Sequence, residues 1–217
     1  SHFIFKNKIK NIETKKYTGT IGHVGTTSFY PTKNLNCFGD GGAMFTNNNL
    51  IAKKIKLIKN HGQEKKYVYK EVGLNSRLDA IQATILRLNL KTLNQSNFKR
   101  RALAEIYNNE LKSLDKILLP KYSFGIENHI FHQYTIIVKN SQNRNSLKNY
   151  LNENGVSSMV YYPKPLHKEI PYKSYNKTKL INSEVLSKKV ISLPIHPLLN
   201  KKEIVYVSNL IKNFFIR

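Results

Sequence analysis

Apolar residues recur at helical spacing in several stretches of the chain. Between Leu50 and Asn60 they occupy positions 50, 51, 55, 57 and 58, and the His61-Gly62 pair that follows is typical of a helix end. The same spacing predicts a second helix over 79–93 and a third that begins near Asn97 and continues to Leu111. Residues 201–215 are expected to form an amphipathic terminal helix.

Short β-rich runs alternate with these helices. Residues 43–46 are expected to form a short buried strand, and further strands are predicted over 132–138 and 156–162. Helices over 145–153 and 183–191 complete the pattern, which indicates layered α/β or α+β packing. The character of the sequence changes over 112–125, so we predict one domain over 1–111 and another over 112–217.

Composition narrows the classes of protein to consider. The chain has 217 residues and 40% hydrophobic content, enough for a folded core. Its single cysteine, Cys37, excludes an internal disulfide framework and any multi-cysteine metal site. No apolar stretch approaches the roughly 18 residues of a membrane span, and no signal peptide is evident. We therefore expect a cytoplasmic protein with no membrane partner and no bound metal.

The net charge of +23 raises the possibility of a nucleic-acid-binding protein. However, 30 of the 36 basic residues are lysines, and they are scattered along the chain. Proteins that read phosphates or bases usually depend on arginine, whose planar fork makes two hydrogen bonds at once. We therefore interpret the lysines as a solvated surface and expect no nucleic-acid partner, with nucleic-acid binding kept as an alternative.

The segment from Gly25 to Gly42 carries the most chemistry. Lys33 stands between a hydroxyl-rich turn at 26–28 and a glycine-rich turn at 39–42. Hydroxyls and free backbone N–H groups suit a phosphate dianion, and a lysine beside them can form a Schiff base with an aldehyde cofactor. The segment is not a Walker A loop. The alternative is an ordinary surface turn that contains one lysine.

The run S-F-Y-P-T-K-N-L-N-C-F-G-D-G-G-A resembles the lysine motif of the DegT/DnrJ/EryC1/StrS family, sugar aminotransferases of PLP-dependent fold type I. Further blocks follow in the family's order: N-H-G at 60–62, G-L-N-S-R-L-D-A-I-Q-A at 73–83, R-x-x-A-x-x-Y-x-x-x-L from Arg101, Q-Y-T-I at 133–136, Y-Y-P-K-P-L-H at 161–167 and S-L-P-I-H-P at 192–197. The resemblance implies an α/β fold: the C-terminal part of the PLP-binding large domain and its connecting helix over 1–111, then the small C-terminal domain over 112–217.

The resemblance also implies a cofactor site for pyridoxal 5'-phosphate. Lys33 would form the Schiff base, and Ser28 would hydrogen-bond the cofactor phosphate, with Thr27 as a weaker candidate. Asn75 would reach the phosphate of a neighbouring subunit's cofactor, since the family's active sites lie at a homodimer interface. From the residues alone, Asn75 is equally consistent with a helix N-terminal cap.

The same resemblance implies a substrate site for a sugar nucleotide. Arg77, Tyr162 and His167 would line that site. The alternatives are a structural ion pair for Arg77 and an ordinary turn residue for His167. The block at 161–167 is most similar to the branch that aminates UDP-linked 2-acetamido-3-keto-uronates, whose negative charge Arg77, His167 and Lys164 could bind.

One departure from the family pattern concerns the cofactor ring. The family places an aspartate for the ring nitrogen in a D-x-A-Q segment just ahead of the lysine motif, and Ser1-His2 align just after that segment. The chain thus resembles the C-terminal portion of a family member. A longer native protein is one expectation, and a split or non-catalytic remnant is the alternative.

The resulting prediction is a PLP-dependent transamination. Glutamate would donate the amino group to a nucleotide-linked keto-sugar in the synthesis of surface polysaccharide or glycan precursors. A sugar dehydratase on the same scaffold would carry histidine where Lys33 stands, so Lys33 argues against that rival.

Overall fold

The computed structural model describes residues 4–9, 12–122, 125–175 and 179–216. By their contacts these residues form two units: the first contains the described residues up to 98 together with 125–130, and the second contains 99–122 and 131–216. The first unit gives way to the second inside a long helix, and the predicted domain division after residue 111 stays a prediction.

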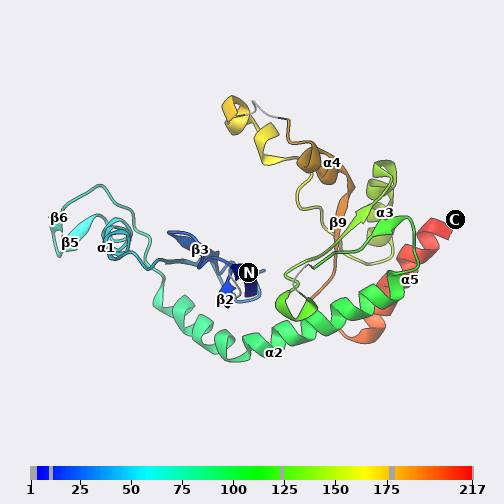
Figure 1. Cartoon of the computed structure of the whole chain (residues 1–217), viewed down its shortest axis with the longest axis horizontal. Helices are drawn as coiled ribbons and strands as arrows, with labels where there is room; N and C mark the ends of the chain where they lie inside the picture. Colours follow the sequence, from blue (N-terminus) through cyan, green and yellow to red (C-terminus); the bar gives the residue numbers. More distant parts are fainter. Residues whose placement is uncertain (1–3, 10–11, 123–124, 176–178, 217) are drawn as a thin grey trace. The chain divides into compact units, whose positions relative to one another are not determined.

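Three hairpins and one helix make up most of the first unit. Strand β1 (Ile4–Ile9) pairs antiparallel with β2 (Ile12–Tyr17), β3 (Gly25–Ser28) with β4 (Gly42–Phe45), and β5 (Gln63–Lys65) with β6 (Val68–Tyr69). Helix α1 (Asn49–Ile58) follows β4 (Figure 1). The β1–β2 hairpin is not predicted from the sequence, because its polar, Lys-rich strands carry no clear apolar period.

Helix α1 confirms the helix predicted over 50–60. The side chain of Asn48 caps it: Oδ1 accepts hydrogen bonds from the backbone N–H groups of Leu50 at 2.9 Å and Ile51 at 3.2 Å. The strand predicted over 43–46 is confirmed as β4, but its predicted burial is wrong. Met44 and Phe45 are 59% and 45% exposed, because β4 pairs with β3 alone among the described strands.

Helix α2 (Ala80–Leu111) is a single helix of 32 residues. The prediction of two helices, separated near residue 95, is therefore wrong. The intervening Asn-Gln-Ser-Asn run lowers helix propensity, but it contains neither glycine nor proline and does not stop the helix. Asp79 precedes the helix, and its Oδ1 accepts a hydrogen bond from the backbone N–H of Ile81 at 2.8 Å.

A three-stranded antiparallel sheet organises the second unit. Its strands are β7 (Ile117–Leu118), β8 (Tyr134–Val138) and β9 (Val190–Leu193), in that order. The unit's α-helices, besides the end of α2, are α3 (Ser141–Glu153), α4 (Ile181–Lys189) and α5 (Lys201–Ile216). Figure 1 shows α5 beside the end of α2, and the Lys212 ammonium lies 2.7 Å from the Glu110 carboxylate.

The core of this unit follows the alternation along β8. Tyr134, Ile136 and Val138 are fully buried, while the residues between them are half-buried. Buried side chains from α3 and α5 belong to the same core: Leu147, Leu151, Ile204 and Ile211. The strand at 132–138 and the helices at 145–153 and 201–215 are thus confirmed.

Two predictions in the second unit need correction. The strand over 156–162 is wrong, since this segment makes only an isolated bridge from Met159 to Ser192. The helix over 183–191 is confirmed as α4, but β9 begins at Val190 and takes over its last two residues. Two short 3-10 helices, Leu166–Lys168 and Ile170–Tyr175, precede α4.

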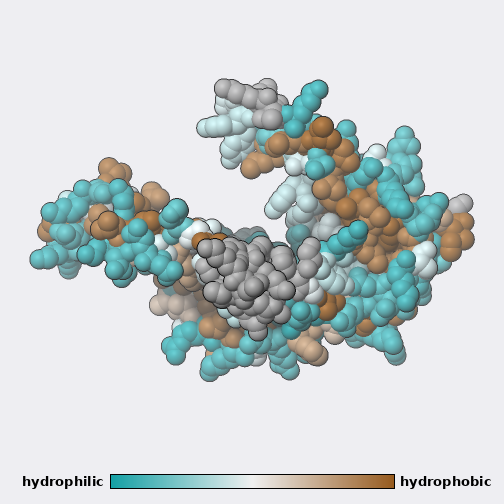
Figure 2. Space-filling model, viewed as in Figure 1, coloured by the Kyte–Doolittle hydropathy of each residue, from teal (hydrophilic) through white to brown (hydrophobic). Residues whose placement is uncertain are grey.

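Several hydrophobic side chains are exposed on α4. Figure 2 shows hydrophobic residues gathered over this helix, where Ile181, Val185 and Leu186 are exposed. Within the described part of the chain, no helix has the length and apolar character needed to cross a membrane.

Candidate functional site

The loop that carries Lys33 connects strands β3 and β4. At its base the backbone N–H of Phe29 donates to the carbonyl of Gly41 at 2.8 Å, and the N–H of Cys37 donates to the carbonyl of Phe29, also at 2.8 Å. The N–H of Lys33 donates to the carbonyl of Tyr30 at 2.8 Å. Lys33 therefore lies in a tight turn at the end of a closed hairpin.

The Lys33 side chain is half-buried, and no described residue forms an ion pair or hydrogen bond with its Nζ. A lysine amine with no described partner is available to attack an aldehyde cofactor. The position of Lys33 therefore fits covalent attachment of pyridoxal phosphate.

The hydroxyl groups of β3 lie on the same hairpin. Oγ of Ser28 accepts a hydrogen bond from the N–H of Tyr30 at 3.2 Å, which leaves its O–H free to donate to an anion. Thr27 lines a cavity of about 650 Å³ between this hairpin and α1. The described lining of this cavity does not include Ser28 or Lys33. The glycine-rich turn serves close strand pairing as well, since a Cβ at Gly42 would lie 2.9 Å from the carbonyl oxygen of Thr27.

Asn75 and Arg77 lie together beside the C-terminal end of α1. Asn75 forms an isolated antiparallel bridge with Asn60. Nη1 of Arg77 donates a hydrogen bond to Oδ1 of the same Asn60 at 2.7 Å. The N-H-G block at 60–62 thus contacts the G-L-N-S-R block at 73–77. The sequence did not predict this contact.

The described contacts show neither the helix cap considered for Asn75 nor the ion pair considered for Arg77. The helix cap is Asp79, not Asn75, which precedes the first residue of α2 by five positions. No acidic group pairs with Arg77 among the described residues, and its described side-chain bond goes to a neutral amide. Both side chains are exposed.

In the second unit, Tyr162, Lys164 and His167 line one cavity of about 590 Å³. Tyr161, Tyr172 and Tyr175 also line it, so four tyrosines contribute to its wall. The structure therefore brings together the candidates predicted from the Y-Y-P-K-P-L-H block, while Lys33, Ser28, Asn75 and Arg77 belong to the first unit.

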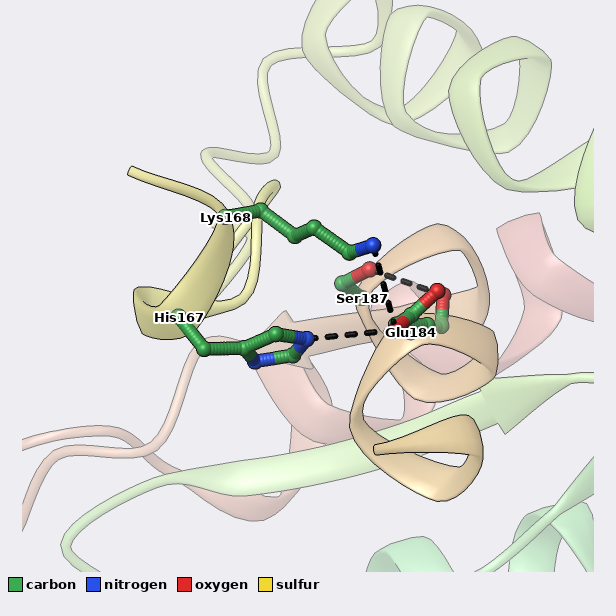
Figure 3. A network of polar contacts seen from close by, with 4 residues as sticks. All are labelled: His167, Lys168, Glu184 and Ser187. Carbon is green, nitrogen blue, oxygen red and sulfur yellow. Dashed lines mark hydrogen bonds and ion pairs between the residues drawn. The ribbon is translucent and has the colours of Figure 1, made fainter. Parts of the chain in front are cut away.

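His167 is held by a polar network with α4, drawn in Figure 3. Its Nε2 lies 3.2 Å from Oε1 of Glu184, and Nζ of Lys168 lies 3.4 Å from the same oxygen. Oγ of Ser187 donates to the backbone carbonyl of Glu184 at 3.0 Å. The hydrogen bond from His167, aided by Lys168 and partly opposed by desolvation, lowers the pKa of Glu184.

His167 is thus a turn residue anchored to a helix rather than a free side chain, with only 11% of it exposed. Lys164 is also engaged, since its ammonium lies 3.3 Å from Glu169. Tyr162 is 73% exposed. Sequence reasoning missed Glu184, although it is the only acidic residue between positions 170 and 202 in a lysine-rich stretch.

A protein-family model described as the DegT/DnrJ/EryC1/StrS aminotransferase family matches residues 8–212. The crystal structure of a DegT DnrJ EryC1 StrS aminotransferase from Brucella abortus is similar to the chain. It has a TM-score of 0.83 and 39% identity, over 91% of this chain and 52% of that one. These similarities confirm the predicted resemblance and the predicted fold class.

Two curated relatives bear on the substrate. The UDP-N-acetyl-3-dehydro-alpha-D-glucosamine 3-aminotransferase of Acidithiobacillus ferrooxidans is 36% identical over 194 residues, 89% of this chain and 51% of that protein. The UDP-2-acetamido-2-deoxy-3-oxo-D-glucuronate aminotransferase of Pseudomonas aeruginosa is also 36% identical, over 190 residues, 87% of this chain and 51% of that protein. The chain spans about half the length of these relatives.

Proposed function

The chain belongs to the DegT/DnrJ/EryC1/StrS aminotransferase family. We propose that it contains the part of a PLP-dependent sugar aminotransferase that bears the cofactor-binding lysine. The protein would move the amino group of glutamate to the ketone carbon of a nucleotide-linked sugar, with 2-oxoglutarate and the amino sugar as products. The proposal rests on one observation: Lys33 is half-buried, has no described partner, and lies on the hairpin that bears Thr27 and Ser28.

Lys33 has two tasks in this proposal. Its Nζ holds the cofactor covalently at rest, and after release it takes the proton from Cα of the amino donor and later returns it. When bound, pyridoxal phosphate supplies an electron-withdrawing ring that stabilises the negative charge left at that carbon. Ser28 donates its hydroxyl hydrogen to the cofactor phosphate, with Thr27 as a weaker donor.

Asn75 serves the same phosphate from the partner subunit of a homodimer. The exposed side chain of Asn75, which does not cap α2, supports a ligand-binding task for the amide. The homodimer, the glutamate donor and cytoplasmic action in the synthesis of glycan precursors are parts of the same proposal.

The proposed substrate is a UDP-linked 2-acetamido-3-keto-uronate. Both relatives described above are 36% identical, although only one name specifies a uronate, so identity does not choose between the sugars. The support comes from Arg77, whose charge is not neutralised by any described carboxylate. Lys164 and His167 contribute less, because Glu169 and Glu184 already pair with them.

The test of the cofactor site uses the protein with its complete native sequence. Incubation with pyridoxal phosphate should give a visible absorption band, and borohydride should fix the label on Lys33. Lys33→Ala should lose both signals, while Lys53→Ala, on the exposed face of α1, should keep them. A label on another lysine would refute the assignment of Lys33, and a protein that never takes up the cofactor would favour a non-catalytic remnant.

The substrate is tested by comparing two nucleotide sugars with glutamate as donor. Formation of 2-oxoglutarate should be faster with the 3-keto-uronate than with a neutral 4-keto-6-deoxy sugar. Equal or faster turnover of the neutral sugar would overturn the uronate assignment and leave the aminotransferase proposal standing.

A further inference from the structure

The loop that follows Lys33 lies along the first half of α2, and three amide side chains of that helix hold it. They are Gln82, Asn89 and Asn97, which contact the loop at Phe38, Asn36 and Asn34 respectively. The intervals of seven and eight residues correspond to about two helical turns each, so the three amides share one face of the helix.

Each contact is a well-formed hydrogen bond. Oε1 of Gln82 accepts from the backbone N–H of Phe38 at 2.8 Å. Nδ2 of Asn89 lies 2.9 Å from both the carbonyl and the Oδ1 of Asn36. The loop is therefore fixed to the helix at two positions beyond its lysine.

The third contact lies next to Lys33 in the sequence. Nδ2 of Asn34 donates to Oδ1 of Asn97 at 2.8 Å and to the backbone carbonyl of Ile130 at 2.9 Å. Asn97 is only 7% exposed, so this bond is sheltered from competing water. Asn34, half-buried and bonded twice, restricts the backbone from which the lysine side chain extends.

The helix supplies these bonds without adding negative charge. From Ala80 to Ala104, α2 contains no aspartate or glutamate. A carboxylate facing the loop would attract the Lys33 ammonium and keep it protonated, which opposes attack on an aldehyde. Amide side chains orient the loop without placing a carboxylate on the helix beside it.

We infer that Gln82, Asn89 and Asn97 are positioning residues that hold the Lys33 loop in its reactive place through uncharged hydrogen bonds. This inference rests on the proposed role of Lys33. Asn97 is the main member, because it is the most buried and acts on the residue adjacent to the lysine.

The test separates the hydrogen bond from the charge. Asn97→Ala removes the acceptor, whereas Asn97→Asp keeps an acceptor oxygen and adds a charge. Gln82→Glu makes the same charge change at a half-buried site, in case a buried aspartate prevents folding. Asn94→Ala and Asn94→Asp are the matched controls, on an exposed residue of the same helix that makes no described side-chain hydrogen bond.

Two readouts are measured on each folded variant of the complete protein. The first is capture of pyridoxal phosphate by Lys33, trapped with borohydride; Asn97→Ala should slow it about tenfold relative to Asn94→Ala, since small misplacements of a reacting group cost this much or more. The second is acetylation of Lys33 by acetic anhydride as a function of pH, which needs no cofactor. Asn97→Asp or Gln82→Glu should move its midpoint upward by about half a unit or more, and Asn94→Asp by less.

The outcomes distinguish the inference from the proposed function. If the unsubstituted protein captures no cofactor at Lys33, the proposed function fails, while the acetylation midpoints still report on the loop. If capture is normal and the Asn97 and Gln82 variants match the Asn94 controls in both readouts, the inference is wrong and the amides are merely structural.

Discussion

Replacing Gly62 with alanine should displace the segment that carries Asn75 and Arg77. Gly62 has a φ of 72°, in the left-handed region that favours glycine. A Cβ added there would lie 1.7 Å from the carbonyl oxygen of Glu71, a backbone atom that cannot rotate away. Carbon atoms of this type essentially never approach within 3.0 Å, so the chain around residue 71 must move by more than 1 Å.

The cost follows from the bonds that this movement breaks. Four backbone hydrogen bonds of 2.8 to 2.9 Å join residues 58–62 to residues 70–76. Loss of two or three of them costs about 2–3 kcal/mol, at roughly 1 kcal/mol each. The left-handed backbone adds about 1–2 kcal/mol for any residue with a Cβ. We therefore expect Gly62→Ala to lower the free energy of unfolding by roughly 3–5 kcal/mol.

Gly155→Ala is the matched control. Gly155 has nearly the same φ, 74°, but nothing lies within 4 Å of its added Cβ among the described residues. Only the left-handed strain applies, so the loss should be about 1–2 kcal/mol. Urea unfolding of both variants gives the difference, and hydrogen exchange at residues 70–76 should speed up only in Gly62→Ala.

Cofactor retention supplies the functional readout of the same pair. Gly62→Ala should release pyridoxal phosphate faster than Gly155→Ala, because Asn75 moves with its segment. Equal stability losses in the two variants, with unchanged exchange at residues 70–76, would refute the geometric reasoning.

Three further predictions test other contacts. Tyr107→Phe should cost about 1–2 kcal/mol of unfolding free energy in thermal or urea denaturation, since its fully buried hydroxyl donates to a backbone carbonyl at 2.9 Å that would be left unpaired. The pKa of Glu184 is lowered in the folded protein, so its contact with His167 stabilises the fold at pH values above the usual carboxyl pKa. This stability is lost as the pH falls below about 4, and Glu184→Gln should abolish this acid dependence in the same denaturation experiments. Asp79→Ala should destabilise α2 by about 1 kcal/mol, whereas Asn75→Ala should leave stability unchanged and weaken cofactor retention; the reverse result would restore Asn75 as a cap.

The sequence alone predicted the elements whose signals are local. The apolar spacing of α1 and the β-rich run of β8 depend on neighbouring residues only, and the structure confirms both. The Lys33 block suggested a cofactor segment through its resemblance to the family's lysine motif, with lysine, hydroxyls and glycines within 18 consecutive residues, and the role of Lys33 stays a prediction.

Tertiary structure decided what the side chains of the candidate site contact. The Asn60–Arg77 and Asn34–Asn97 bonds join residues 17 and 63 positions apart, and no period in the sequence encodes such separations. The continuity of α2 was also beyond local propensity, because a low-propensity run lies inside one continuous helix. Residue types fix which groups can hydrogen-bond, but only the folded backbone determines which donor meets which acceptor.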